Sequence, residues 1–160
     1  MIIAVDMEIR ISLLQAVQAV FFFSLLIAVS AWDLRYRIIP DRFQAGIALL
    51  SFLNFAPRQL FGALGAVPYL IVALFCKREG GIGGGDIKLM FGAGFFLGAR
   101  LTVVAAFLGI LLGGGFGALL LAAKKADRKT RFAFGPFLCI GIAAAMFFGE
   151  RLADWYIGLL

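Results

Sequence analysis

The chain has 160 residues, 63% of them hydrophobic and only 15% charged, and its formal net charge is +6. Soluble domains are about half apolar and a quarter charged, so a water-soluble fold is excluded because too few polar side chains remain to cover its surface. We predict one membrane-embedded domain over residues 1–160. Its positive charge is expected to contact lipid head groups and to set the topology of the chain, and no nucleic acid is expected as a partner.

Uncharged stretches long enough to cross about 30 Å of hydrocarbon as helices recur along the chain. Two shorter apolar runs lie between them, at 43–57 and 89–99. They reach spanning length only if the flanking Arg42 and Lys88 extend to the interface, and otherwise they form re-entrant or partial helices. The expected fold is all-α, a polytopic membrane protein with about six transmembrane helices. The four long stretches are Ile11–Trp32, Gln59–Cys76, Leu101–Ala123 and Phe132–Gly149.

Basic residues indicate how these segments are oriented. If all six cross, alternate loops place 11 of the 15 Lys and Arg residues on one side of the membrane and 4 on the other. The positive-inside rule makes the first side cytoplasmic and puts the N-terminus outside. The cytoplasmic set is Arg35, Arg37, Arg42, Lys77, Arg78, Lys88, Lys124, Lys125, Arg128, Lys129 and Arg131, and the other set is Arg10, Arg58, Arg100 and Arg151.

Cysteine and histidine usage narrows the chemistry. The chain has two cysteines, Cys76 and Cys139, without a CxxC pair, and it has no histidine. A zinc site is therefore not expected, and every Ser-His or Cys-His mechanism is excluded. We interpret both cysteines as buried small hydrophobic residues, and we expect no metal. Any catalysis would rest on carboxylates, Lys, Tyr or a cofactor.

Two of the nine acidic residues stand out by position. Asp33 ends the first predicted span and Asp86 begins the fourth, so both carboxylates should lie at the same depth near the cytoplasmic surface. Charges at membrane depth are costly and indicate function. Two such acids in a partly dry site share a proton, which is what aspartyl proteolysis requires. Alternatively, they are unrelated interfacial acids that are hydrated or paired with Arg or Lys.

Three short elements carry a family resemblance. The stretch GGGD at 83–86 fits the GxGD signature of intramembrane aspartyl proteases, and its extension GGGDIKLM resembles the GxGDxKL of type IV prepilin peptidases. DLRYRIIPD at 33–41 is similar to the other aspartate element of that family, and FGPFL at 134–138 to its late Phe-Gly-Pro element. The three occur in the family's order, each at the cytoplasmic end of a predicted span.

The resemblance implies an enzyme, a membrane aspartic endopeptidase with Asp33 and Asp86 as its catalytic pair and no cofactor. Its implied partners are type IV pilin-like precursors, whose short basic leader is removed at the cytoplasmic face of the inner membrane. Such peptidases serve type IV pili and secretion systems. Gly83, Gly85 and Lys88 take the signature positions of the active-site loop; Pro40, Asp41, Gly135 and Pro136 are substrate-contacting or structural.

One departure from the family bears on a second activity. Many bacterial members carry an additional cytoplasmic segment with paired CxxC motifs, and they also methylate the new N-terminus with S-adenosylmethionine. No such segment occurs in this sequence, so methyltransferase activity is not expected. The chain looks more like the short, peptidase-only members of tight-adherence or Flp-type systems.

Other readings of the same features stay open. A small non-enzymatic channel, transporter subunit or secretion or pilus assembly scaffold would account for the spans, glycines and basic loops. A presenilin-type GxGD protease would pair its signature with a Tyr-Asp element, whereas Asp33 follows Trp32.

Within the acidic pair, Asp86 at a helix N-terminus would be the base and Asp33 at a helix C-terminus the acid.

Local roles are expected for the neighbouring residues. Pro40 should end the loop before the second span, and Asp41 should cap that helix or meet a basic leader. Lys88 should reach for lipid head groups. Glycines in the fifth predicted span should allow close helix packing or a bend. These glycines are Gly113, Gly114, Gly115 and Gly117.

Overall fold

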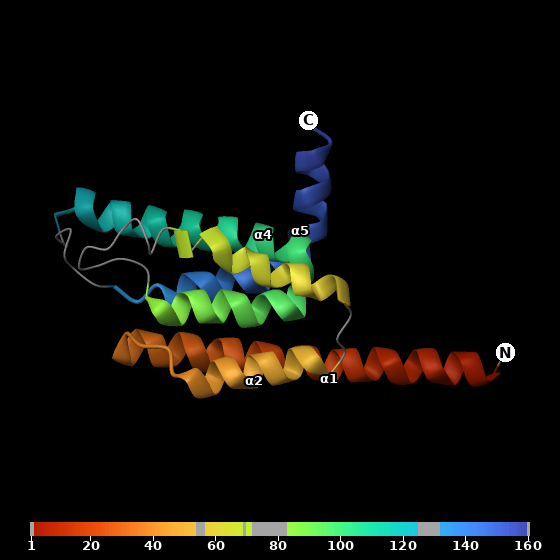
Figure 1. Ribbon diagram of the computed structural model, residues 1–160. Coiled ribbons are helices and arrows are strands. Elements are labelled where there is room, and N and C mark those ends of the chain that lie inside the picture. Colours follow the sequence, from red (N-terminus) through yellow and green to blue (C-terminus); the bar gives the residue numbers. More distant parts are fainter. Residues whose placement is uncertain (1, 54–56, 69, 72–82, 125–131, 160) are drawn as a thin grey trace.

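The computed structural model describes residues 2–53, 57–68, 70–71, 83–124 and 132–159. All the regular structure in these ranges is helical, which confirms the all-α expectation for the described part of the chain (Figure 1). The elements are α1 (Ile2–Tyr36), α2 (Asp41–Phe52), the 3₁₀ helix η1 (Pro57–Ala66), α4 (Gly84–Ala122) and α5 (Gly135–Ile157).

The long element α4 is a helical hairpin. Its backbone leaves the helical region at Gly98, where φ is 77° and ψ is 169°. A side chain would be strained in that conformation, so glycine is the residue that permits the reversal. In Figure 1 the chain runs one way through the first half of α4 and returns through the second. The runs predicted at 89–99 and 101–123 are therefore separate helices that meet at Gly98.

Successive segments alternate in direction along the bundle (Figure 1). The connection after α1, the start of α4 and the start of α5 lie at one end, as the distribution of basic residues predicts. Within the described residues, three helical elements are long and apolar enough to cross a membrane: Leu13–Tyr36, Gly84–Ala122 with its bend at Gly98, and Gly135–Ile157. At 1.5 Å per residue, α2 is only about 18 Å long. Six crossings therefore remain a prediction.

The third predicted span is described only in part. Its described part consists of residues 59–66 of η1, which are 3₁₀ rather than α-helical, and of residues 67, 68, 70 and 71. Residues 72–82 and 125–131 lie outside the described residues, and with them Cys76, the glycines at 80 and 81, and six of the eleven basic residues assigned to the cytoplasmic side.

Much of the described core is formed by stripes on α1, α4 and α5, and Ile47 of α2 and Ala105 and Ala106 of α4 are buried with them. Buried positions recur every three or four residues, so each stripe follows one helical face. Many large apolar side chains on the other faces are exposed, as in a protein surrounded by lipid. The buried stripes are Phe22, Leu26 and Val29 on α1, Leu89, Met90 and Ala93 on α4, and Leu138, Ile142 and Ala145 on α5.

Glycines let the backbones approach closely. A Cβ added at Gly94 would lie 2.2 Å from the carbonyl oxygen of Gly62, and one at Gly141 would lie 2.8 Å from the carbonyl oxygen of Ala105. Of the glycines singled out in the fifth span, Gly113 and Gly117 pack against phenylalanine rings. Gly114 and Gly115 face open space, so only part of that glycine run serves packing.

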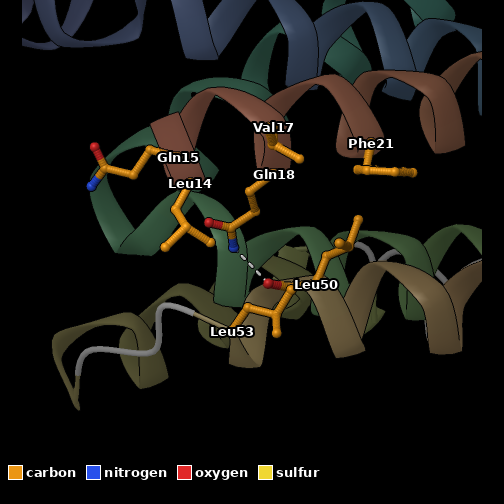
Figure 2. Close-up of a pocket in the computed structure, with 7 residues that line it drawn as sticks. All are labelled: Leu14, Gln15, Val17, Gln18, Phe21, Leu50 and Leu53. Atoms are coloured by element: carbon orange, nitrogen blue, oxygen red, sulfur yellow. Dashed lines mark hydrogen bonds between the residues drawn. The ribbon is translucent and has the colours of Figure 1, made fainter. Parts of the chain in front are cut away.

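A groove of about 330 Å³ lies between α1 and α2 (Figure 2). The side-chain amide of Gln18 donates a hydrogen bond across it to the carbonyl oxygen of Leu50. Gln18 precedes Asp33 by 15 residues on one helix, which is about 22 Å. The groove is thus remote from the acidic pair. Its lining is Leu14, Gln15, Val17, Gln18, Phe21, Leu50 and Leu53.

Candidate active site

Asp33 lies in the last turn of α1 and is buried, with 5% of its surface exposed. It follows Val29 by four residues and so extends the core stripe of α1. Its Oδ2 atom accepts a hydrogen bond of 2.8 Å from the backbone N–H of Gly135, the first residue of α5. Phe134, the N-cap residue of α5, supplies no side-chain cap. Asp33 therefore provides the carboxylate that the start of α5 lacks.

Asp86 is the third residue of α4 and is also buried, with 7% exposed. It precedes Leu89 by three residues and so ends the core stripe of α4. Its Oδ2 atom accepts a hydrogen bond of 3.1 Å from the N–H of Gly83, and its own N–H donates to the carbonyl oxygen of Gly83 at 3.0 Å. The carboxylate thus satisfies a free N–H group at the helix start, as the acidic residue of a capping box does.

The structure brings the two predicted acids together. Their carboxylates are close enough for the charges to interact, and the thiol of Cys139 lies within electrostatic range of both. Each uses Oδ2 for its backbone hydrogen bond, and no described residue donates a hydrogen bond to either Oδ1. One oxygen of each carboxylate is therefore fixed by a helix start, and the other is available to a water molecule or a substrate.

The dipole argument for separate roles does not hold in this geometry. Asp33 lies at the C-terminal end of α1, as expected, yet its carboxylate faces the N-terminus of α5. Asp86 faces the N-terminus of α4. A helix N-terminus stabilises negative charge, so both carboxylates receive the same kind of support. The basis for making Asp86 the base and Asp33 the acid is removed.

Two glycines are needed where other groups approach. A Cβ at Gly135 would lie 2.8 Å from Oδ2 of Asp33, and a Cβ at Gly85 would lie 3.0 Å from the Cβ of Ile39. At Gly83 the nearest atom would be Oδ2 of Asp86 at 3.4 Å, an ordinary contact, and Gly84 faces open space. The signature glycines therefore differ: Gly85 lies in tight contact with Ile39, while Gly83 contributes its N–H.

The start of α2 is fastened to the start of α4. Lys88 forms an ion pair of 2.7 Å with Asp41, and the side-chain amide of Gln44 donates a hydrogen bond of 3.2 Å to the carbonyl oxygen of Gly85. The expectation that Asp41 caps α2 was wrong: Pro40 is the N-cap residue, and no side chain caps this helix. Lys88 contacts Asp41, whereas lipid head groups were expected.

Gln44 and Cys139 were missed as members of the site. Both are buried, Gln44 beside the glycine loop and Cys139 beside the two acids. Gln44 is the first polar residue of the mainly apolar run at 43–57, which also contains Ser51 and Asn54, and that signal could have found it. Pro136 is the second residue of α5 and is buried, a position that suits proline because its missing N–H is not needed there.

The described residues contain no group of three or more His, Cys, Asp or Glu side chains placed to hold a metal ion. The site as described consists of two carboxylates, one thiol, backbone N–H groups and one amide side chain. Such a set can bind water and exchange protons with it.

Comparisons with known proteins extend over most of the chain. The type IV leader peptidase family matches residues 20–118, a range that includes Asp33 and Asp86 but stops before Gly135. The prepilin leader peptidase/N-methyltransferase of Bacillus subtilis is 33% identical over 152 residues, which cover 90% of this chain and 60% of that protein. Its namesakes in Xanthomonas campestris and Legionella pneumophila are each 31% identical and are covered over 50% of their length.

These relatives are longer than this chain, which spans between half and 60% of their length. In this chain the alignments cover 82% for the Xanthomonas protein and 84% for the Legionella protein. No solved structure matches the chain significantly.

Proposed function

Because the chain belongs to the type IV leader peptidase family, we propose that it is a membrane aspartyl endopeptidase that removes the short basic leader of type IV pilin-like precursors. The observation that supports this most is the meeting of Asp33 and Asp86, two buried carboxylates from different helices, at one end of the core. Burying two like charges together is costly. A proton shared between them lowers that cost and prepares the pair for acid–base catalysis.

In the proposed reaction one carboxylate takes a proton from a water molecule while the water oxygen attacks the scissile carbonyl carbon. The other, protonated carboxylate gives its proton to the carbonyl oxygen. When the tetrahedral intermediate collapses, the C–N bond breaks and the proton first taken from water passes to the leaving nitrogen. The products are a free carboxylate on the leader and a free amine on the mature protein.

Backbone N–H groups fix the positions of the two carboxylates. Gly135 fixes Oδ2 of Asp33 and Gly83 fixes Oδ2 of Asp86, so both Oδ1 atoms are left for the reaction. Gly85 and Lys88 attach the active-site loop to the start of α2 through Ile39 and Asp41. In this proposal Pro40, Asp41, Gly135 and Pro136 act structurally, because they begin α2 and α5 at the level of the pair.

The proposed setting is the cytoplasmic face of the inner membrane. The described residues Arg35, Arg37, Arg42 and Lys88 lie near the acidic pair along the chain, and the positive-inside rule puts such residues in the cytoplasm. A substrate with a basic leader and an apolar helix would present its cleavage site at this depth, where membrane lipids surround both proteins.

The purified chain in detergent, incubated with a synthetic precursor that joins a basic leader to an apolar helix, tests this function. We expect a single cleavage at the junction. In water enriched in heavy oxygen, the new carboxyl group of the leader should gain one heavy oxygen atom, as mass spectrometry would show.

Asp33→Asn and Asp86→Asn should each lower the cleavage rate by roughly a thousandfold or more, because a dyad works as a unit. Asp154→Asn is the matched control, since Asp154 is an exposed acid near the end of α5. A channel or assembly scaffold would cleave nothing, and retained cleavage in either dyad variant would overturn the mechanism.

A further inference from the structure

The end of α5 differs from the rest of that helix. Residues 150–159, called here the C-terminal segment, come after the fifteen residues that run from the acidic pair to the opposite end of the bundle. In Figure 1 the dark blue end of the chain turns away from the direction of the first part of α5 and of the other helices. Gly149, the last residue before this segment, packs closely on Leu101, where an added Cβ would be 2.6 Å from Cδ2.

One face of the C-terminal segment is charged and clamped. Arg100 forms an ion pair of 2.7 Å with Glu150 through Nη1, and a second with Asp154 through Nη2. Glu150 and Asp154 are four residues apart and share one helical face. Because Arg100 follows Gly98 by two residues, the clamp holds the segment against the reversal of α4. Both acids are thereby paired with Arg100, and the three groups together keep one negative charge.

The opposite face is apolar and uncovered. At 100° per residue, Leu152 and Tyr156 point away from Glu150 and Asp154, with Trp155 at their edge. Leu159, two residues after the end of α5, is exposed as well. These four side chains are between 40% and 66% exposed. A charged face turned to the bundle and an apolar face turned outward describe an amphipathic surface helix. Four apolar side chains are also too few for a stable dimer, which needs roughly 20–30 residues a side.

We propose that the C-terminal segment lies in the plane of the membrane interface, in the leaflet opposite the Asp33–Asp86 site, with its apolar face among the acyl chains. Trp and Tyr are enriched at this depth because their rings are apolar at one end and polar at the other. A helix of this kind buries its apolar face about 5–10 Å into the boundary between head groups and chains. It fixes the height of the bundle in the bilayer.

Depth-dependent quenching of Trp155 fluorescence tests the proposal. The chain contains two tryptophans, so Trp32→Phe leaves Trp155 as the only reporter. The full-length variant is reconstituted in phosphatidylcholine vesicles that carry a nitroxide at the head group or at a shallow or deep acyl position. We expect shallow quenching to exceed deep quenching at least about twofold. Strongest quenching by the deep label would mean that the segment crosses the core and would overturn the proposal.

Absence of quenching at every depth would also overturn it, because another protein surface, such as a second copy of the chain, would then cover the segment. The control carries Trp32→Phe, Trp155→Phe and Phe107→Trp. Phe107 is exposed in the second half of α4, nine residues or about 14 Å after Gly98, and should be quenched most by the deep label. Equal depths for the two reporters would contradict the proposal. The assay reads depth rather than cleavage, so its outcome is independent of the proposed activity.

Discussion

The Oδ2 atom of Asp33 accepts a hydrogen bond of 2.8 Å from the backbone N–H of Gly135, 102 residues later in the chain. This contact joins the end of α1 to the start of α5. It also fixes the position of the Asp33 carboxylate, because the N–H of Gly135 can move only if α5 moves. Gly135 allows the contact because it has no side chain: a Cβ there would lie 3.2 Å from the Cβ of Asp33 as well as against its carboxylate.

Gly135→Ala should therefore inactivate the proposed peptidase by displacing Asp33. A shift of about 1 Å in a catalytic group can cost a hundredfold in rate, so we expect at least a tenfold loss of kcat against a synthetic precursor. Alanine favours a helix over glycine by about 1 kcal/mol. A lower activity of the variant could therefore not be attributed to a weaker α5 helix. Steady-state kinetics on the folded variant would check this, and full activity would show that Asp33 does not depend on this contact.

The two adjacent glycines Gly84 and Gly85 offer a matched pair. A Cβ at Gly85 would press on Ile39, while one at Gly84 would meet nothing within 4 Å. Gly85→Ala should push the start of α4 away from α2 and lower the cleavage rate about tenfold. Gly84→Ala should change the cleavage rate by no more than about twofold. Equal effects of the two substitutions would argue that backbone freedom, rather than contact with Ile39, is what the loop requires.

The ion pair between Lys88 and Asp41 should contribute little to stability. Both side chains are largely exposed, at 59% and 77%, and exposed pairs are typically worth less than about 1 kcal/mol. Asp41→Asn should thus lower the midpoint of thermal unfolding only slightly, and high salt should have a similar small effect. If the variant instead loses cleavage with an unchanged midpoint, Asp41 serves the reaction, either by holding Lys88 of the active-site loop or by contacting substrate, which was the other role considered for it.

Much of this arrangement could be predicted from sequence because membrane spans and short motifs are local signals. The resemblance to prepilin peptidases is confirmed by the family match. Apolar stretches predicted the helices, and Asp33 and Asp86 could be placed at one depth because each adjoins such a stretch. Their buried spacing, four residues after Val29 and three before Leu89, follows from helical periodicity.

Contacts between distant segments could not be predicted in the same way. Nothing near Asp33 indicates that it meets the start of α5, because the partner is a backbone N–H group that every residue except proline carries. The pairing of Lys88 with Asp41 depends on how α2 packs beside α4, which no local pattern encodes. The 3₁₀ form of η1 was likewise unexpected, since its sequence reads as an ordinary apolar span.

Close packing of η1 on the first half of α4 leads to a last prediction. Gly62 and Gly94 face each other so closely that a Cβ on either would lie about 2 Å from the carbonyl oxygen of the other, at 1.9 Å and 2.2 Å. Backbone atoms cannot move aside cheaply, so Gly94→Ala should lower the free energy of unfolding by roughly 1–3 kcal/mol, as overpacking does. Gly114 makes the matched control, since it lies on the second half of α4 and faces open space. Gly114→Ala should leave stability unchanged or raise it slightly. Thermal unfolding in detergent, followed by loss of the helical circular dichroism signal, would compare the two variants. Equal midpoints would show that η1 does not pack against α4 at this distance.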